Sequence, residues 1–164
     1  MKKKITLSHR IFLINKKYKK KEFFHYIKEP SNSLIIPVLN NKYFVIVVQK
    51  REPINKKNYE FPMGWIDNNE LPIKAASREL LEETGYKTLI KPKELMICYP
   101  DPGRIKKKMY CFYTDRIRKI SNEEKTIKIV CCSKNEIIKL INKQKFNNAS
   151  HIAAFYKYIS KIKK

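Results

Sequence analysis

Residues 64–86 read GWIDNNELPIKAASRELLEETGY. From Leu71 to Thr84 the residues are mostly good helix formers, and Gly85 stands where a helix commonly ends in a left-handed residue. The turn-forming sequence Asp67-Asn68-Asn69 comes just before. The stretch therefore predicts a turn, then a helix over residues 71–84 with Gly85 as its C-terminal cap.

Three glutamates of the predicted helix share one face. At about 100° per residue, Glu82 lies about 60° to one side of Glu79 and Glu83 about 40° to the other. Like charges at this spacing destabilise a helix, and the dipole near a helix C-terminus disfavours anions. A bound divalent cation would remove both penalties, and Mg²⁺ prefers carboxylate oxygens. The spacing leaves open the alternative of a solvated acidic face paired with lysines.

Acidic residues and glycines concentrate around the predicted helix. Six of the fifteen acidic residues lie between positions 60 and 83, in a chain whose formal net charge is +22. The chain has only three glycines, Gly64, Gly85 and Gly103. In so glycine-poor a sequence, a glycine indicates a backbone position that a side chain would obstruct. At Gly64 this favours a close approach of the backbone to a ligand.

Residues 64–86 resemble the Nudix box. That family's pattern is a Gly, five residues, a Glu, seven residues, and then Arg-Glu-aliphatic-any-Glu-Glu-any-Gly. Every fixed position is matched from Gly64 to Gly85, and Tyr86 is an aromatic residue at the aliphatic-type end. The resemblance implies the family's α/β fold, an α/β/α sandwich with a mixed sheet. It also implies cleavage of a nucleoside diphosphate linked to another moiety, by attack of water on one phosphorus.

The resemblance implies roles for the residues of the box. Glu79, Glu82 and Glu83 would bind Mg²⁺ or Mn²⁺, and the Gly64 carbonyl would be a further ligand. Arg78 would orient Glu79 by a charged hydrogen bond. Glu70 would support the metal site or its waters.

Segments outside the box resemble the ADP-ribose and nucleotide-sugar pyrophosphatase branch of the family. Gln49-Lys50-Arg51, followed by Glu60-Phe61-Pro62-Met63-Gly64, is similar to the branch's approach to the box. Pro102 lies where the branch has a proline in its substrate loop, and residues 146–153 resemble the start of its last helix. The predicted substrate-binding residues are Arg51, Glu60, Pro102 and Gly103. The predicted substrate is ADP-ribose or a related nucleotide sugar.

A glutamate on a late loop often serves as the general base in this branch. The matching region here holds Glu123 and Glu124, and the resemblance does not choose between them. If this region is an ordinary polar turn, Glu82 or Glu83 is the stronger candidate for activating the water.

The rest of the chain predicts strands around the helix and two helices at the end. Residues 34–39, 43–48, 90–98, 108–115 and 126–132 are expected to be strands, residues 51–59 a loop, and residues 135–142 and 149–162 helices. Residues 1–33 are expected to form a short extension and residues 34–164 the hydrolase domain. Two apolar stretches of the extension, 11–14 and 23–27, predict a hairpin. In the branch this region often builds a swapped homodimer and supplies an aromatic side chain that stacks on adenine, and Phe23, Phe24 and Tyr26 are the candidates.

The positive charge of the chain raises alternative functions that involve RNA. A net charge of +22 attracts polyanions, which keeps hydrolysis of the 5′-triphosphate end of RNA as a second candidate. Because lysine is spread through the whole chain, compositional bias is favoured over a dedicated RNA surface. A further alternative is a protein without catalytic activity, an inactive nucleotide- or RNA-binding module. The presence of every glutamate of the box argues against it.

Four cysteines without a CxxC pair predict neither a zinc site nor a disulfide framework, and adjacent Cys131 and Cys132 are expected to face opposite sides of a strand. No apolar run approaches the length of a membrane span, so a cytoplasmic protein is expected. The histidines show no ligand or nucleophile spacing, and His151 is expected to be structural.

Overall fold

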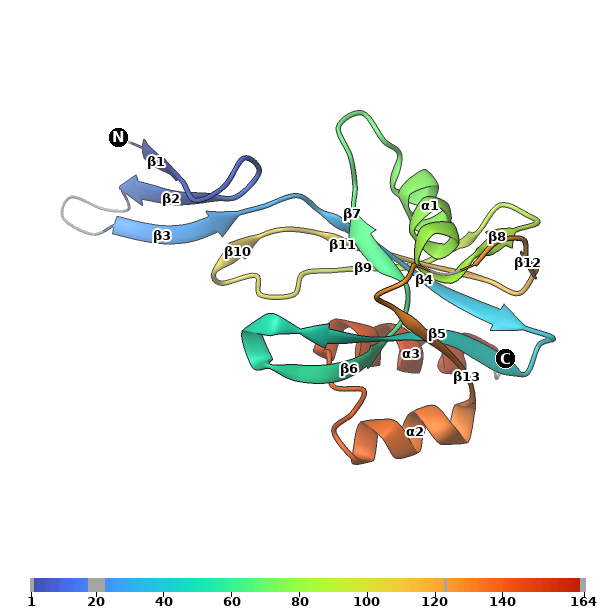
Figure 1. Ribbon diagram of the computed structural model, residues 1–164. Helices are drawn as coiled ribbons and strands as arrows, with labels where there is room; N and C mark the ends of the chain where they lie inside the picture. The colour runs from blue at the N-terminus through green and yellow to red at the C-terminus, as the bar shows by residue number, and fades with distance from the viewer. Residues whose placement is uncertain (1, 18–22, 123, 163–164) are drawn as a thin grey trace.

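A central mixed sheet with helices on both faces forms the body of the computed structural model, which describes residues 2–17, 23–122 and 124–162 (Figure 1). The strand order is β13-β5-β4-β11-β9. β4 and β11 run parallel, and the other neighbours are antiparallel. The strands are β4 (Asn32–Leu39), β5 (Tyr43–Arg51), β9 (Lys93–Cys98), β11 (Met109–Thr114) and β13 (Lys128–Ser133), with β6 (Lys56–Glu60) paired to β5 and β7 (Met63–Trp65) paired to β4. The predicted α/β/α sandwich with a mixed sheet is confirmed.

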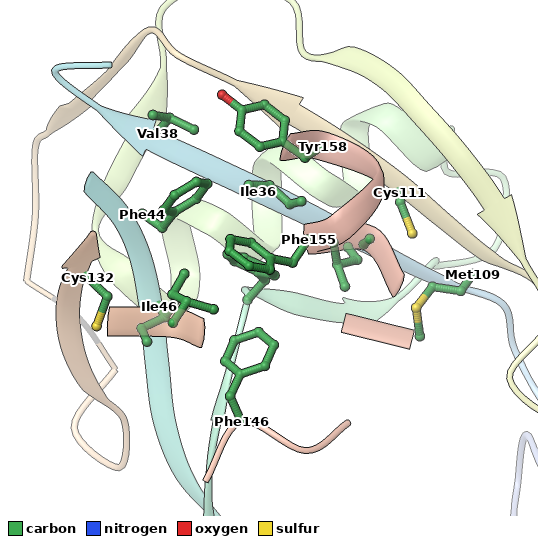
Figure 2. Packing of buried hydrophobic residues seen from close by; sticks show 14 residues of the cluster. Ile36, Val38, Phe44, Ile46, Met109, Cys111, Cys132, Phe146, Phe155 and Tyr158 are labelled. Carbon is green, nitrogen blue, oxygen red and sulfur yellow. The ribbon is translucent and has the colours of Figure 1, made fainter. Parts of the chain in front are cut away.

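One face of the sheet packs against the two C-terminal helices, α2 (Lys134–Asn142) and α3 (Ala149–Ile162). Phe44 of β5 meets Phe155 and Tyr158 of α3 edge to face, with ring centroids 5.5 and 5.7 Å apart, as Figure 2 shows. Ile36 and Val38 of β4 point into the same cluster. This cluster is the larger part of the hydrophobic core.

The other face packs against α1 (Pro72–Thr84). Ile35 of β4 and Val45 of β5 are buried there with Ala76 and Leu80 of the helix. Successive residues of a strand point to opposite faces, so the fully apolar run in β4 serves both clusters. The catalytic candidates of α1 are therefore carried by a helix whose inner face is fixed to the central sheet.

The ends of α1 agree with the sequence prediction. The helix begins at Pro72, whose carbonyl accepts a hydrogen bond from Ser33 Oγ at 2.6 Å. It ends at Gly85, which takes a φ of 69° and donates its N–H to the Leu81 carbonyl at 2.8 Å. A turn at residues 67–70 precedes the helix, as predicted.

A second sheet stands beside the body of the molecule. Its order is β1-β2-β3-β10, and it is built from β1 (Lys2–Thr6), β2 (Phe12–Lys17), β3 (Phe23–Lys28) and the short β10 (Ile105–Lys106). The predicted hairpin is confirmed as β2 and β3, while β1 was not predicted. The three N-terminal strands extend away from the central sheet (Figure 1), and β10 comes from the later part of the chain.

The prediction of a loop over residues 51–59 was wrong. β5 continues to Arg51, a 3₁₀ turn spans Glu52–Ile54, and β6 returns alongside β5. Pairing with β5 satisfies the backbone of this polar segment, and Asn58 is buried although its residue type favours loops. The small sheet of β8 (Tyr86–Thr88) and β12 (Ile117–Lys119) was also not predicted.

Two further predictions concern the cysteines and the length of apolar helices. Cys131 is exposed and Cys132 is buried, so the two side chains face opposite sides of β13 as expected, and all four cysteines are free. In the described part of the chain, no helix combines the length and the apolar character needed to cross a bilayer.

Candidate active site

Arg78 of α1 joins the turn before the helix to the carboxylates on the helix face. Its Nε and Nη2 donate to the two oxygens of Glu70, each at 2.9 Å. Its Nη1 donates to Glu79 at 2.6 Å and to Glu82 at 3.0 Å, and Nη2 also donates to the Trp65 carbonyl at 2.9 Å. These bonds, above all those to Glu70, raise the pKa of Arg78 beyond its already high ordinary value.

Glu70 closes the turn that leads into α1. Its Oε2 accepts the N–H of Asp67 at 3.0 Å, and its own N–H donates to the Asp67 carbonyl at 3.1 Å. The bonds from Arg78 hold the pKa of Glu70 below its ordinary value. Glu70 therefore stays an anion that is bound to Arg78, and through Arg78 it is linked to Glu79 and Glu82.

Gly64 of β7 lies against the carboxylate of Glu79. A β-carbon at residue 64 would overlap the Glu79 carboxyl group, so only glycine permits this packing. Burial raises the pKa of Glu79, whereas the bond and charge of Arg78 act to lower it. A side chain at residue 64 would thus be obstructed, here by the Glu79 carboxylate, and the approach of a ligand to the Gly64 backbone stays a prediction.

Glu83 is a buried carboxylate, with 8% of the residue exposed. Its Oε2 accepts the backbone N–H of Met63 at 3.2 Å. Burial and, next, the charge of Glu79 raise the pKa of Glu83 to about 8. Arg51 and Glu60 also influence this pKa, in opposite directions, so both charges lie near the helix carboxylates.

The donors on this face have the chemistry that a hard divalent cation requires. Carboxylate and carbonyl oxygens are the ligands that Mg²⁺ and Mn²⁺ prefer, and a cation would relieve the crowding of negative charge at Glu79 and Glu83. Over residues 2–17, 23–122 and 124–162, no three His, Cys, Asp or Glu side chains already form a ligand set. The carboxylates of Glu79 and Glu82 accept hydrogen bonds from Arg78, and that of Glu83 accepts one from the Met63 N–H. Metal binding therefore requires these carboxylates to exchange part of their present hydrogen bonds for the cation.

Arg51, at the end of β5, pairs with Glu60, at the end of β6. Its Nε donates to Glu60 Oε1 at 3.0 Å, and its Nη2 pairs with the second oxygen. Glu60 is 1% exposed and also accepts a bond from Asn58 at 2.7 Å. Burial acts to raise the pKa of Glu60, but the bonds and charges of its neighbours, led by Arg51, lower it overall. Of these two predicted substrate-binding residues, Arg51 is partly exposed and Glu60 is the buried group that fixes it.

A cavity of about 730 Å³ lies between the second sheet and the loop after β9. Pro102 and Gly103 line it together with Phe24 and Tyr26 of β3, so the structure brings these predicted residues together. The side chain of Phe23 lies outside the described part of the chain. Five cationic residues also line the cavity, and none of its lining residues is acidic: Lys28, Arg104, Lys106, Lys107 and Lys108. Aromatic rings with cations are the usual partners of nucleotide bases and phosphates.

Glu124 lies in the loop between β12 and β13, and Glu123 lies outside the described residues. The Glu124 carboxylate is exposed and accepts a bond from Thr126 Oγ1 at 2.8 Å. The loop starts beside the end of α1, where the Gly85 carbonyl accepts the N–H of Ile120 at 2.9 Å.

The comparison with protein families rests on most of the chain. The sequence pattern of the NUDIX domain matches residues 29–154, which include α1, the Arg51–Glu60 pair and the loop with Pro102. The chain belongs to the Nudix family. Its glutamate-rich helix α1 is the helix of the Nudix box.

Two relatives by sequence and one solved structure are similar to this Nudix chain. It is 41% identical over 73 residues to the ADP-sugar pyrophosphatase of Mus musculus, a match that covers 42% of the chain and 33% of the mouse protein. It is 25% identical over 142 residues to the ADP-ribose pyrophosphatase of Bacillus subtilis, covering 84% of the chain and 75% of that relative. A solved structure described as an ADP compounds hydrolase superposes with a TM-score of 0.82 at 18% identity, over 99% of this chain and 92% of the other. The structural match establishes the fold, and the chain spans about a third of the mouse relative's length.

Several contacts around the Nudix box were not anticipated from the sequence. Arg10 reaches the turn before the helix, where its Nη1 donates to Asp67 at 3.0 Å. His151 of α3 accepts the N–H of Phe61 at Nδ1, at 3.1 Å, which confirms a structural role. Because both contacts join segments far apart in the sequence, no local pattern predicts them. The only signal available for Arg10 was that it is one of six arginines in a chain with 31 lysines.

Proposed function

We propose that this Nudix hydrolase cleaves the diphosphate linkage of ADP-ribose or a related nucleotide sugar in a Mg²⁺-dependent reaction, giving a nucleoside monophosphate and a sugar phosphate. The observation that carries the proposal is the grouping of an arginine for phosphate, Arg51, with the carboxylates of the Nudix helix. Glu60, which pairs with Arg51, stands three residues before Met63, whose N–H donates to Glu83 at 3.2 Å. The names of the mouse and Bacillus subtilis relatives support the same substrate class.

The metal-binding residues in this proposal are Glu79, Glu82 and Glu83, with the Gly64 carbonyl beside them. When bound, a divalent cation neutralises the diphosphate and lowers the pKa of a water molecule. Arg78 holds the carboxylates of Glu79 and Glu82 on one side of the helix. In the same proposal, Glu70 keeps Arg78 in place, and Mn²⁺ would serve in place of Mg²⁺.

The diphosphate would be bound by Arg51, which Glu60 holds at a fixed angle. A guanidinium with two of its N–H groups anchored keeps its remaining donors pointing in set directions, and this favours recognition of phosphate oxygens. The nucleoside would lie in the cavity lined by Phe24, Tyr26, Pro102 and Gly103, where ring stacking binds a base. The cations of this cavity would add attraction for the phosphates.

In the reaction, a water oxygen forms a bond to one phosphorus while the bond from that phosphorus to the bridging oxygen breaks. The proton of the water passes to a carboxylate. Glu123 and Glu124 of the late loop are the candidates for this base, with Glu82 or Glu83 in their place if the loop remains an ordinary turn. The leaving phosphate departs with the bridging oxygen.

We also propose that the chain forms a homodimer through the extension of residues 1–33, with residues 34–164 as the hydrolase domain. The N-terminal strands stand away from the central sheet (Figure 1), and Ile5 at the end of β1 and Leu7 in the turn after it are exposed. Exposed apolar side chains gathered on one element favour association.

The first experiment measures product release with Mg²⁺ from ADP-ribose, other nucleotide sugars, dinucleoside polyphosphates and 5′-triphosphate RNA, all at one ionic strength. We expect the fastest turnover with ADP-ribose or another nucleotide sugar. Glu83→Gln should lower kcat by about 100-fold or more, because loss of a metal ligand costs at least as much as loss of its supporting contacts. Glu52→Gln is the matched control, since Glu52 is an exposed glutamate that pairs only with Lys50 among the described residues.

The panel separates the alternatives. Preferred attack on RNA would replace the nucleotide-sugar proposal with the RNA one and would assign a role to the basic charge. No metal-dependent turnover of any substrate would favour a binding module. Equal activity of the Glu83 and Glu52 variants would contradict the roles given to the helix carboxylates.

A further inference from the structure

Arg10 lies in the turn between β1 and β2, and it contacts the turn that leads into the Nudix helix. Its Nη2 donates to the Ile66 carbonyl at 2.7 Å, and its Nη1 donates to Asp67 Oδ1 at 3.0 Å. Its guanidinium also lies over the Trp65 ring, 5.3 Å from the centroid. One side chain of the N-terminal extension thus contacts three successive residues of the Nudix box, and it is 21% exposed.

Asp67 connects Arg10 with Arg78. Its Oδ1 pairs with Arg10 at 3.0 Å, and its Oδ2 lies 3.9 Å from Arg78 Nη2. The same Nη2 donates to the carbonyl of Trp65, whose ring lies under Arg10. Both arginines therefore contact residues 65–67, and Arg78 is also bonded to Glu79 and Glu82.

The residue type at position 10 supports a role that depends on geometry. The chain contains 31 lysines and six arginines, so lysine is its ordinary cation. Three of the arginines, at positions 10, 51 and 78, form the ion pairs around the candidate site. Lys50–Glu52 and Lys107–Glu29 are ion pairs of lysine, and neither includes a residue of the Nudix box. A planar guanidinium can donate two bonds in fixed directions and stack on a ring at the same time, whereas an ammonium cannot.

We propose that Arg10 is a positioning residue of the active site, through which the N-terminal sheet holds the turn at residues 65–70 and the arginine that orients the metal-binding carboxylates. This inference rests on the proposed function, in which Glu79 and Glu82 bind the metal. Arg10 touches neither of them, and it acts through Asp67 and Arg78. The N-terminal extension is then part of the catalytic apparatus as well as a surface for association.

The test measures the affinity for Mn²⁺ alone, from the electron paramagnetic resonance signal of the free ion, together with kcat, KM and the melting temperature. The variants are Arg10→Ala and Arg10→Lys. Arg116→Ala is the control that removes the same charge from an exposed position, and Glu82→Gln is the reference for a metal ligand. Contacts that support a metal ligand are worth about 10- to 100-fold in affinity. Because Arg10 acts one contact further out, we expect Arg10→Ala to weaken Mn²⁺ binding about fivefold and to lower kcat with little change in KM.

Arg10→Lys should keep most of this defect, since lysine restores the charge without the paired bonds. Wild-type behaviour of Arg10→Lys would show that charge alone acts and would overturn the positioning role. A lower melting temperature with unchanged Mn²⁺ affinity in Arg10→Ala would make the residue merely structural. If Glu82→Gln weakens Mn²⁺ binding and Arg10→Ala does not, only the role of Arg10 fails. If Glu82→Gln also has no effect, the metal site of the proposed function fails with it.

Discussion

Gly64 and Glu79 are packed so closely that the smallest side chain would separate them. The glycine belongs to β7 and the glutamate to α1, and the missing side chain at residue 64 leaves room for the Glu79 carboxylate between strand and helix. Glu79 is held on its other side by Arg78. A carboxylate confined between a backbone and a guanidinium has few positions available, and we expect this confinement to keep the Glu79 carboxylate close to where the proposed cation would bind.

Gly64→Ala tests this packing. The added methyl group would overlap the Glu79 carboxylate, so the glutamate must move away from its place. We expect Mn²⁺ affinity and kcat to fall by about tenfold or more. Gly103→Ala is the matched control for folding and Mn²⁺ binding, because its β-carbon would meet only Asp101 Oδ1, at an ordinary 3.6 Å. Wild-type Mn²⁺ affinity in Gly64→Ala would show that Glu79 does not need its present position.

The candidate residues that the sequence could predict are those set by helical spacing or by the motif. Glu79, Glu82 and Glu83 share a face because the helix repeat puts them there, and Arg78 lies beside them in the chain. Arg10 could not be predicted, because its contact with Asp67 joins residues 57 positions apart. Nor could the burial of Glu60, which depends on the unpredicted strand β6.

At the scale of elements, the Nudix helix is held at both ends. Ser33 of β4 bonds to its first residue, and Gly85 at its end lies so close to Ser121 that a β-carbon there would overlap the Ser121 carbonyl. The late loop with the candidate bases therefore starts from a fixed point at the helix end. The left-handed φ of Gly85 favours glycine in addition to this close contact.

The elements that were predicted are those with a strong internal pattern. The helix of residues 71–84 and the apolar strands β4 and β5 have such patterns, and the structure confirms them. β6 has polar composition, and it is a strand because β5 supplies its hydrogen-bond partners. β1 begins with three lysines and forms for the same reason, by pairing with β2. Tertiary pairing decides such segments, and a single sequence does not display it.

The docking of α3 depends on a buried histidine, and this makes a prediction about acid stability. His151 is fully buried, stacks on Phe61 and accepts its N–H, so the ring is neutral. Burial, with the charge of Arg51 and against that of Glu60, lowers the pKa of His151 from 6.5 to about 4. The unfolded state therefore binds more protons than the folded state between these values. The stabilising contribution is complete above pH 6.5 and is lost as the pH falls towards 4.

We expect this loss to reach about 3 kcal/mol of unfolding free energy between pH 7 and pH 4. Urea unfolding across this range should show a steeper decline for the wild type than for His151→Gln, which keeps a hydrogen-bond acceptor and does not titrate. His25→Gln changes an exposed histidine and controls for the loss of an imidazole. Parallel curves for the wild type and His151→Gln would contradict the prediction.

At the scale of the whole molecule, the net charge of +22 opposes association of two copies. An interface between copies must therefore be apolar enough to outweigh the repulsion, or must form where the charge is screened. The turn after β1 offers such a surface, because Leu7 is 57% exposed there and Ile5, at the end of β1, is also exposed. The same sheet carries Arg10, so an interface on it would lie next to the residue that holds the Nudix turn.

The proposed homodimer should therefore become more stable as salt is added. Between about 50 and 500 mM KCl the screening length falls from about 14 to about 4 Å, which removes most of the repulsion between the copies and leaves apolar contacts intact. Sedimentation velocity should show a larger dimer fraction at the higher concentration. Leu7→Glu should weaken the dimer about tenfold by placing a charge in the apolar contact. Leu89→Glu makes the same change at an equally exposed leucine on β8's following turn, 52% exposed, and should leave the dimer unchanged. A monomer at every salt concentration would contradict the dimer, and equal effects of the two variants would place the interface away from the N-terminal sheet.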